Sequence, residues 1–291
     1  MRISIVTPSF NMLPYLRRCR ASVADQAGVE VEHIIADGGS SDGTVAWLEA
    51  NGQRIQADAP AGGGTSLHFF SGPDAGMYDA LNKGFDAATG DVTAWLNCDE
   101  QYLEGTLRLV AERFAADPQL DMLFGGALLV RPDGSLLAAR KAYPARYAQI
   151  AVSHLYNLSC AMFFRRRLWE GGLRFDTRLR MLGDHHLVMR ALREGARTGI
   201  VKKPLSAFTF TGANLSWTDR AKEEAALLRG SAPRWARVLR GPLNALRLAE
   251  KALHGGYWHG PVEYALYASA EDAARTRHQV KNVPVKWPKD E

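Results

Sequence analysis

Two adjacent carboxylates, Asp99 and Glu100, directly follow an apolar run at residues 92–96. This run of β-branched, aromatic and aliphatic residues predicts a buried strand, which would place both acids at its carboxyl end. Open α/β sheets bind ligands at that edge, and carboxylate oxygens there suit Mg²⁺ or Mn²⁺ carrying a diphosphate. The alternative for such a pair, taken alone, is a solvated acidic turn after a strand.

A second acidic position, Asp184, begins a helix that the apolar spacing of residues 187–192 predicts. The helix dipole favours a carboxylate at this end and keeps it ionised. A structural N-cap is the alternative for a single Asp before a helix. His185 and His186 are adjacent and not four residues apart, so they are a poor zinc pair on one helix.

Polar loops follow two strands that we expect early in the chain. Residues 3–6 and 30–36 predict strands, and residues 13–26 between them have the apolar spacing of a helix. The two strands of such a βαβ unit are parallel, so the loops at 7–11 and 37–44 would lie on one edge of the sheet. The glycines of the second loop allow the backbone to approach a ligand closely.

The next segment contains a further polar cluster. Residues 51–66 are rich in Gly, Ala, Gln and Pro and predict a flexible excursion, without the lysine that follows the glycines of a P-loop. A helix after it would present Asp79, Asn82 and Lys83 on one face, because they are three and four residues apart. This face could meet a ligand, or it could belong to an ordinary exposed amphipathic helix.

The elements that must position these residues indicate an α/β fold. Beyond the elements above, we expect a helix at 106–116 and strands at 67–70, 120–130, 136–142, 159–164 and 200–210. Strands alternating with helices predict a Rossmann-like, mixed but mainly parallel sheet flanked by helices. We assign residues 1–217 to this domain and residues 218–291 to a helical C-terminal appendage.

The C-terminal segment is basic and aromatic. Arginines alternate there with leucine and tryptophan, and Pro242 is expected to separate two helices. A basic helix with an apolar face fits peripheral contact with a membrane, here through residues 228–267. The alternative is a helical appendage that packs on the main domain with its arginines in solvent. No nucleic acid is expected as a partner, because no helix-turn-helix, zinc finger or RNA-binding signature is present.

Composition sets outer limits on the class of protein. The chain has 291 residues, of which 46% are hydrophobic and 23% charged, and its net charge is +5. These values predict a globular protein with a large core. Three isolated cysteines without zinc spacing favour a reducing compartment, and neither a signal peptide nor an apolar run of about 18 residues is evident. We therefore expect a cytoplasmic protein.

The order of the motifs carries more information than any one of them. The five stretches 7–11, 37–44, 74–84, 96–100 and 183–187 together resemble the family 2 glycosyltransferases with the GT-A fold. The resemblance covers about residues 1–217. Five ordered motifs at this spacing are highly specific for the family, although the family uses many donors and acceptors.

The resemblance implies a role for each matching residue. Contacts with the nucleotide or donor sugar fall on Thr7, Pro8, Ser9, Asn11, Asp37, Gly39, Asp74, Asn82, Lys83, Asn97 and Asp99. Asp99 and Glu100 match the metal-binding acidic pair, with Glu in place of the usual second Asp, and Asp184 matches the catalytic base. Gly38 departs from the family pattern because it replaces a second acid. The contact with the uracil or thymine ring of the nucleotide would therefore pass to Asp37 or to backbone.

The activity that the resemblance implies is inverting sugar transfer. The donor would be a nucleotide-diphosphate sugar, with UDP favoured, and the acceptor a hydroxyl of a glycan or lipid-linked glycan in cell-surface polysaccharide biosynthesis. A divalent cation (Mg²⁺ or Mn²⁺) would neutralise the departing diphosphate, and an ionised carboxylate would take the acceptor proton. Such an enzyme would be cytoplasmic and peripheral on the inner face of the cytoplasmic membrane.

Two other classes of protein remain as alternatives. A nucleotidyltransferase should carry a glycine-rich, lysine-bearing N-terminal loop, and residues 7–12 contain neither Gly nor Lys. A non-catalytic nucleotide-sugar or glycan-binding protein would not need acids at 99, 100 and 184.

Overall fold

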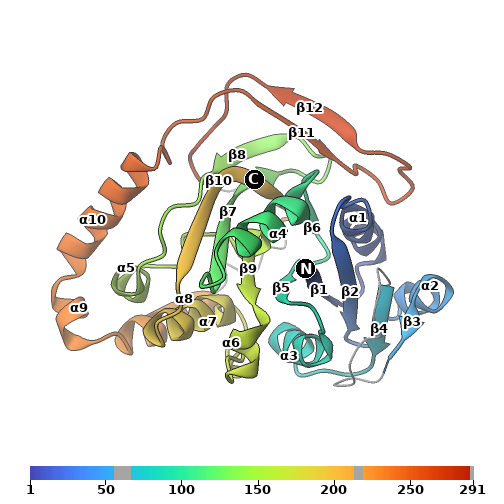
Figure 1. Ribbon diagram of the computed structural model, residues 1–291, viewed down its shortest axis with the longest axis horizontal. Helices are drawn as coiled ribbons and strands as arrows, with labels where there is room; N and C mark the ends of the chain where they lie inside the picture. The colour runs from blue at the N-terminus through green and yellow to red at the C-terminus, as the bar shows by residue number, and fades with distance from the viewer. Residues whose placement is uncertain (56–66, 213–218, 289–291) are drawn as a thin grey trace.

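A mixed sheet forms the centre of the computed structural model, which describes residues 1–55, 67–212 and 219–288. Within these residues the strand order is β3-β4-β2-β1-β5-β9-β7-β10-β6, with β8 beside β7 (Figure 1). Most of the predicted excursion at 51–66 and of the loop at 211–217 lies outside the described residues. The strands of this sheet are β1 (Arg2–Ser9), β2 (Glu30–Asp37), β3 (Gln53–Arg54), β4 (Leu67–Ser71), β5 (Val92–Trp95), β6 (Glu100–Tyr102), β7 (Met122–Val130), β8 (Leu136–Arg140), β9 (Met162–Arg165) and β10 (Thr198–Thr209).

Helices flank the sheet and extend into the C-terminal segment. They are α1 (Leu13–Ala24), α2 (Thr44–Asn51), α3 (Met77–Ala87), α4 (Thr106–Ala116), α5 (Tyr147–Val152), α6 (Arg166–Glu170), α7 (Gly183–Arg193), α8 (Asp219–Gly230), α9 (Arg234–Val238) and α10 (Arg240–Leu253). The prediction of a mixed, mainly parallel sheet with helices and a C-terminal helical region is confirmed. Pro242 lies in the first turn of α10, where its missing N–H is tolerated, and the two helices meet at Leu239.

The parallel strands bring several polar loops to one edge. β1 pairs in parallel with both β2 and β5, and β2 pairs in parallel with β4. In this register Ser9, Asp37 and Ser71, the last residues of their strands, lie side by side. The loops that follow β1, β2 and β4 therefore leave the sheet at one edge, as the βαβ pattern predicts.

Three element boundaries differ from the sequence-based expectation. The strand expected at 92–96 ends at Trp95, and Glu100 begins β6, which pairs antiparallel with β10 opposite Phe208. The segment 159–161 is a short 3₁₀ helix that precedes β9. β10 is one long strand whose register with β7 shifts around Pro204, since proline has no N–H to donate to the ladder.

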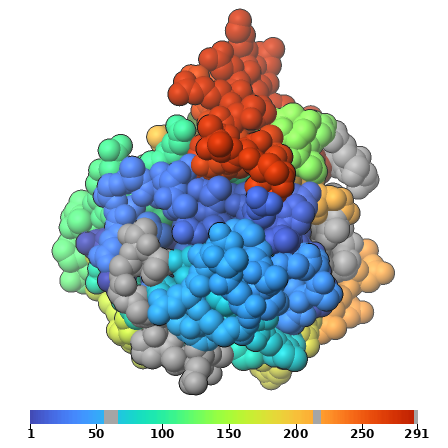
Figure 2. Space-filling model, turned by 90° about the vertical axis from the view of Figure 1, so that its right-hand side faces the viewer, coloured from blue at the N-terminus to red at the C-terminus, as the bar shows by residue number. Residues whose placement is uncertain are grey.

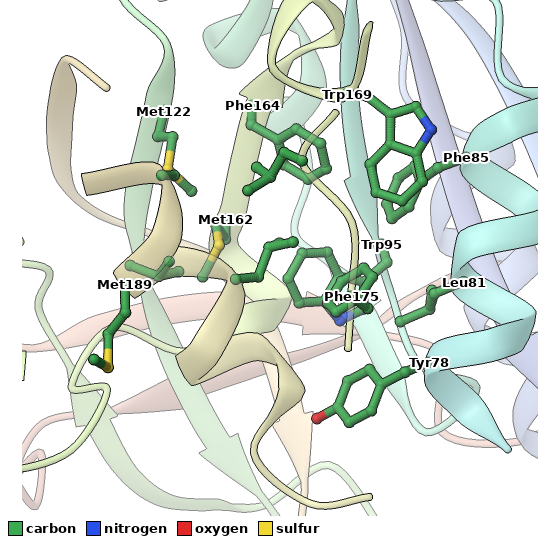
Figure 3. Close-up of a cluster of buried hydrophobic side chains, with 14 of the residues drawn as sticks. Tyr78, Leu81, Phe85, Trp95, Met122, Met162, Phe164, Trp169, Phe175 and Met189 are labelled. Carbon is green, nitrogen blue, oxygen red and sulfur yellow. The ribbon is translucent and has the colours of Figure 1, made fainter. Parts of the chain in front are cut away.

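An aromatic core packs around Trp95 at the end of β5 (Figure 3). The ring of Phe85, from α3, is centred 6.3 Å from that of Trp95, 4.9 Å from that of Trp169 and 6.1 Å from that of Phe175. Trp95 is the last residue of β5 and is almost completely buried. Packing around Trp95 therefore fixes the strand end from which residues 96–100 leave.

The C-terminal segment ends in a hairpin that the sequence did not indicate. β11 (Val262–Leu266) pairs antiparallel with β12 (Thr276–Val280). The hairpin is joined to the main domain by Arg275, which donates to Asp25 and to the Tyr102 carbonyl, and by Tyr267, which exchanges backbone hydrogen bonds with the Gln101 side chain. In Figure 2 this red segment projects beyond the face formed by the blue N-terminal elements.

None of the described helices combines the length and the apolar composition that a membrane span needs.

Candidate active site

The loops after β1 and β2 are tied together by backbone and side-chain hydrogen bonds. Gly38 N–H donates to the Ser9 carbonyl at 2.8 Å, and Asn11 N–H donates to Ser40 Oγ at 2.8 Å. The Asn11 side-chain oxygen accepts from Ser41 N–H at 2.8 Å, while the Asn11 backbone has a left-handed φ of 51°. These bonds hold both loops as one rim on the sheet edge.

The other two predicted residues of the first loop point toward the protein. Thr7 is buried, and its hydroxyl lies 3.0 Å from His33 Nε2 in the core. The Pro8 carbonyl accepts from Cys98 Sγ at 3.0 Å, which joins the first loop to the acidic turn after β5. Contacts of Thr7 and Pro8 with a nucleotide stay predictions.

Asp37 organises the second loop. Its buried carboxylate accepts from Gly39 N–H at 3.1 Å, from Ser40 N–H at 3.0 Å and from Ser71 Oγ at 2.6 Å. The Ser40 hydroxyl donates to the same carboxylate. Asp37 therefore shapes the loop from within, and its direct contact with a nucleotide stays a prediction.

Gly38, the departure from the family pattern, has a structural reason. A Cβ at Gly38 would lie 2.8 Å from Oδ2 of Asp74, which is closer than real Cβ atoms come to other heavy atoms. The other oxygen of Asp74 accepts from Gly76 N–H at 2.7 Å. The carboxylate of Asp74 therefore fills the space that a side chain at 38 would need, and an acid is present there from a different loop.

The polar face of α3 is engaged with neighbouring segments. Lys83 forms an ion pair with Asp79 at 3.0 Å, and Asp79 also accepts from Ala75 N–H. Asn82 donates to the Phe175 carbonyl at 3.1 Å and accepts from Phe175 N–H at 3.0 Å. Asn82 thus joins α3 to the chain before α7. Donor contacts of Asn82 and Lys83 stay predictions, and they would require these partners to be shared or exchanged.

Hydrogen bonds between Asn97 and Glu100 close the acidic turn at residues 97–100. Glu100 is fully buried, its Oε2 accepts from Asn97 N–H at 2.8 Å, and its own N–H donates to the Asn97 carbonyl at 3.0 Å. Within the described residues, Glu100 Oε1 and Asn97 Oδ1 have no hydrogen-bond partner. Because buried acceptors are rarely left unpaired, these two atoms indicate a place for a donor or a cation.

Burial raises the pKa values of all three carboxylates in this region, and for Glu100 the neighbouring acids add to the effect. Burial raises the pKa of Asp99 to about 6. Burial and the nearby Asp99 raise the pKa of Glu100 well above its usual value, and the charge of Asp184 adds to the effect. The three acids therefore lie close enough together for their charges to interact at the carboxyl edge of the sheet.

The residues present fit a divalent cation. Glu100 Oε1 is an orphaned hard-oxygen ligand beside a second carboxylate, and a cation would relieve their repulsion. Among the described residues, no group of three or more His, Cys, Asp or Glu side chains is arranged to hold a metal ion. Asp99 and Glu100 would therefore hold it together with oxygens of a bound diphosphate, as Mg²⁺ sites commonly do.

Asp184 is brought to the same region by a close contact between α3 and α7. The ring of Tyr78 packs on Gly183, where a Cβ would lie 2.6 Å from a ring carbon, and the Tyr78 hydroxyl donates to the Met181 carbonyl at 3.1 Å. Leu182 is the N-cap residue of α7, so Asp184 lies in the first turn and is not the cap. Burial raises the pKa of Asp184 to about 6.

Two residues near Asp184 were missed by the sequence analysis. The guanidinium of Arg180 approaches the loop before α3 so closely that a Cβ at Gly76 would lie 2.3 Å from its Nη1. Glu224, from α8, accepts backbone hydrogen bonds from residues 180, 181 and 182 at 2.7, 2.9 and 3.0 Å. The proximity of Arg180 to Asp184 in sequence could have drawn attention to it, but no sequence signal connects Glu224 with a loop some 40 positions away.

Glu224 provides a test of how the loop before Asp184 is held. Burial acts to raise the pKa of Glu224, but its three backbone N–H donors outweigh burial and keep that pKa below the usual value. In Glu224→Gln one acceptor oxygen becomes an NH₂ group that faces an N–H donor. We expect the free energy of unfolding, measured by denaturant titration, to fall by about 1–3 kcal/mol.

Glu223→Gln is the matched control, because Glu223 is exposed on the same helix and its replacement should change stability by less than about 0.5 kcal/mol. Equal effects of the two substitutions would mean that the contacts of Glu224 do not hold the loop.

Comparison with known proteins identifies the family. The Glycosyl transferase family 2 domain matches residues 4–172, more than half of the chain. The chain belongs to this family, and the predicted resemblance and its GT-A fold are confirmed.

Individual relatives are more distant. A PGL/p-HBAD biosynthesis glycosyltransferase of Mycobacterium bovis is 30% identical over 127 residues, which are 43% of this chain and 46% of the relative. The chondroitin synthase of Pasteurella multocida is 23% identical over 66% of this chain and 19% of its own length. The chain thus spans less than half the length of these curated relatives.

Solved structures agree in fold. S. aureus TarS in complex with UDP-GlcNAc has a TM-score of 0.61 and 18% identity, covering 86% of this chain and 72% of that chain. The mannosyltransferase PcManGT from Pyrobaculum calidifontis, in complex with GDP-Man and Mn²⁺, has a TM-score of 0.55 and 19% identity, covering 86% and 75%.

Proposed function

We propose that this protein is an inverting, metal-dependent glycosyltransferase that moves a sugar from a nucleotide-diphosphate donor to an acceptor hydroxyl. The observation that carries the proposal is the meeting of the predicted motifs at one sheet edge, where Asp99 and Glu100 lie within electrostatic range of Asp184. Membership of family 2 supports the same reaction class.

The residues of the chain divide the work as follows. Asp99 and Glu100 would hold Mg²⁺ or Mn²⁺, and the cation would supply Lewis-acid stabilisation of the departing diphosphate. Asp184 takes the proton of the acceptor hydroxyl as that oxygen attacks the anomeric carbon. A base with a pKa of about 6 is ionised at neutral pH yet still basic enough to accept a proton in the transition state. One displacement inverts the anomeric centre.

The donor and acceptor classes follow from the relatives. TarS with UDP-GlcNAc supports a nucleotide-sugar donor and favours UDP, while PcManGT with GDP-Man and Mn²⁺ supports a metal ion at such a site. Relatives named chondroitin synthase and hyaluronan synthase support a glycan acceptor in cell-surface polysaccharide biosynthesis.

A screen of sugar donors tests the proposed reaction. Purified protein is incubated with UDP-, dTDP-, GDP- and CDP-sugars and Mn²⁺, and release of the free nucleoside diphosphate is followed with and without glycan acceptors. We expect turnover of a UDP-sugar that rises when the acceptor is added. Failure of every donor to release its nucleotide would contradict the proposed reaction.

The pH dependence of the reaction should report the base. Since Asp184 must be ionised to accept a proton, kcat/KM should fall about tenfold per pH unit below about 6 and level off above it. Saturating Mn²⁺ would lower the pKa values of both proposed ligands, Asp99 and Glu100, by favouring their ionised forms, so the remaining limb near pH 6 is assigned to Asp184. A profile that stays flat from pH 5 to 8 would contradict this assignment.

We further propose that residues 228–267 touch the inner face of the cytoplasmic membrane, where a lipid-linked acceptor would lie. Leu239, Leu246 and Leu253 are seven residues apart, lie on one face and are exposed, as is Trp235. The adjoining face, which includes Glu250, packs on the main domain, where Glu250 accepts from Arg146 and Gln149. Packing and an exposed apolar stripe, which the sequence offered as alternatives, are therefore both present on α10.

A further inference from the structure

Three arginines from three consecutive helices line adjoining cavities on the α8–α10 side of the molecule (Figure 1). The larger cavity, of about 510 Å³, is bordered by Arg229 and Arg240 and by His154. The smaller one, of about 270 Å³, shares Arg229 and Arg240 and adds Arg237. The proposed reaction assigns no role to these three arginines.

The positive charge of this cavity is not balanced by the protein. Within residues 1–55, 67–212 and 219–288, Arg229, Arg237 and Arg240 form no ion pair and no side-chain hydrogen bond. The carboxylate of Glu250, on the same helix as Arg240, is occupied by Arg146. Three guanidinium groups beside one cavity are therefore left with their donors available.

Two further arginines, Arg140 and Arg247, add positive charge near His154, which borders the larger cavity. Burial, followed by the charges of Arg140 and Arg247, lowers the pKa of Lys251 to about 8. Burial, again with Arg247 and Arg140, lowers the pKa of His154 to about 4. The surroundings of the cavity are therefore positively charged, which favours an anion, and guanidinium groups match phosphate oxygens in pairs.

We propose that this cavity binds the phosphate group of a membrane lipid. Leu239 lies in sequence between Arg237 and Arg240 and is 46% exposed, and Trp235 on the same short helix is 54% exposed. Apolar side chains thus border the arginines, as a headgroup site at a bilayer surface requires, whereas a site for a soluble phosphate does not need them. The proposal rests on the membrane contact proposed above and gives that contact its headgroup chemistry.

Vesicle binding by matched variants tests the cavity. Co-sedimentation is measured with phosphatidylglycerol vesicles and with phosphatidylcholine vesicles for the full-length protein. The test variant is Arg229→Gln, Arg237→Gln, Arg240→Gln, and the control variant is Arg113→Gln, Arg193→Gln, Arg277→Gln, which removes the same charge from exposed positions elsewhere. Calorimetry with inorganic pyrophosphate measures how tightly the same proteins bind a free anion. Calorimetry with UDP and Mn²⁺ measures binding at the nucleotide site.

We expect the wild type to bind phosphatidylglycerol vesicles, the test variant to bind them at least tenfold more weakly, and the control variant to stay within twofold of the wild type. Equal binding by the test variant and the wild type would overturn the cavity assignment. If pyrophosphate bound through the three arginines but vesicles did not bind, the cavity would be a site for a free anion, and the proposal of a lipid phosphate would be wrong.

If the wild type did not bind UDP but still bound vesicles through the three arginines, this result would contradict the proposed sugar transfer and support the lipid site. Retained UDP binding by the test variant shows that it is folded.

Discussion

Replacing Asp184 with Asn is expected to lower kcat about a thousandfold while leaving the affinity for the nucleotide within about threefold of the wild type. Asparagine keeps the size of the side chain and can still accept from His185 N–H through its carbonyl oxygen, as Asp184 does at 2.7 Å. It cannot take a proton, and a positioned general base typically contributes 10²–10⁴-fold. Steady-state release of UDP measures kcat, and calorimetry measures nucleotide affinity.

The control for this substitution is Asp219→Asn. Asp219 also lies in the first turn of a helix, but it is exposed and pairs only with Lys222 among the described residues, so its replacement should leave kcat unchanged. A kcat for Asp184→Asn within tenfold of the wild type would remove Asp184 from the role of base. Retained nucleotide binding together with lost turnover would also separate an enzyme from a non-catalytic binding protein.

Replacing Asp99 with Asn is expected to weaken metal-dependent binding of the nucleotide about 100-fold and to lower kcat/KM by at least as much. The substitution removes one of two carboxylates that would hold the cation, and the loss of a stabilised diphosphate is worth several kcal/mol in the transition state. Nucleotide affinity is measured at several Mn²⁺ concentrations, and kcat/KM is measured from UDP release.

The same variant distinguishes a ligand-binding role from a structural one. Asp99 raises the pKa of its neighbour Glu100, so removing its charge relieves repulsion, and the metal-free protein should be as stable as the wild type or more stable. Asp91→Asn, an exposed acid at the other end of β5, is the matched control and should keep nucleotide affinity. If Asp99→Asn were much less stable than the wild type but kept metal-dependent nucleotide binding, Asp99 would have a structural role and would not be a metal ligand.

The parts of the site that the sequence predicts are those carried by local patterns. The strand ending near Trp95, the loop beginning at Asp37 and the helix beginning near Asp184 each combine an apolar period with a polar end. Parallel pairing of β1 with β2 and β5 then brings their loops to one edge. These features depend on neighbours in sequence and on general rules of sheet topology, so a single sequence contains them.

The remaining features depend on contacts between distant segments. Glu100 begins a strand because β10, more than 100 residues later, pairs with it, and Glu224 reaches the loop before Asp184 from the C-terminal segment. Gly38 is a departure from a motif in the sequence, and only the position of Asp74 explains it. The hairpin of β11 and β12 consists of two five-residue strands, and it is joined to the domain by Arg275 and Tyr267, which no periodicity marks.

Calorimetric binding of UDP, dTDP, GDP and CDP, with and without Mn²⁺, tests the central claim most directly. The measurement compares the wild type with an Asp99→Ala Glu100→Ala variant whose folding is checked by circular dichroism. We predict that the wild type binds one nucleotide, UDP, in a metal-dependent manner and that the variant does not. If the wild type bound no nucleotide under either condition, the assignment of the acidic turn as a nucleotide-diphosphate site would be wrong.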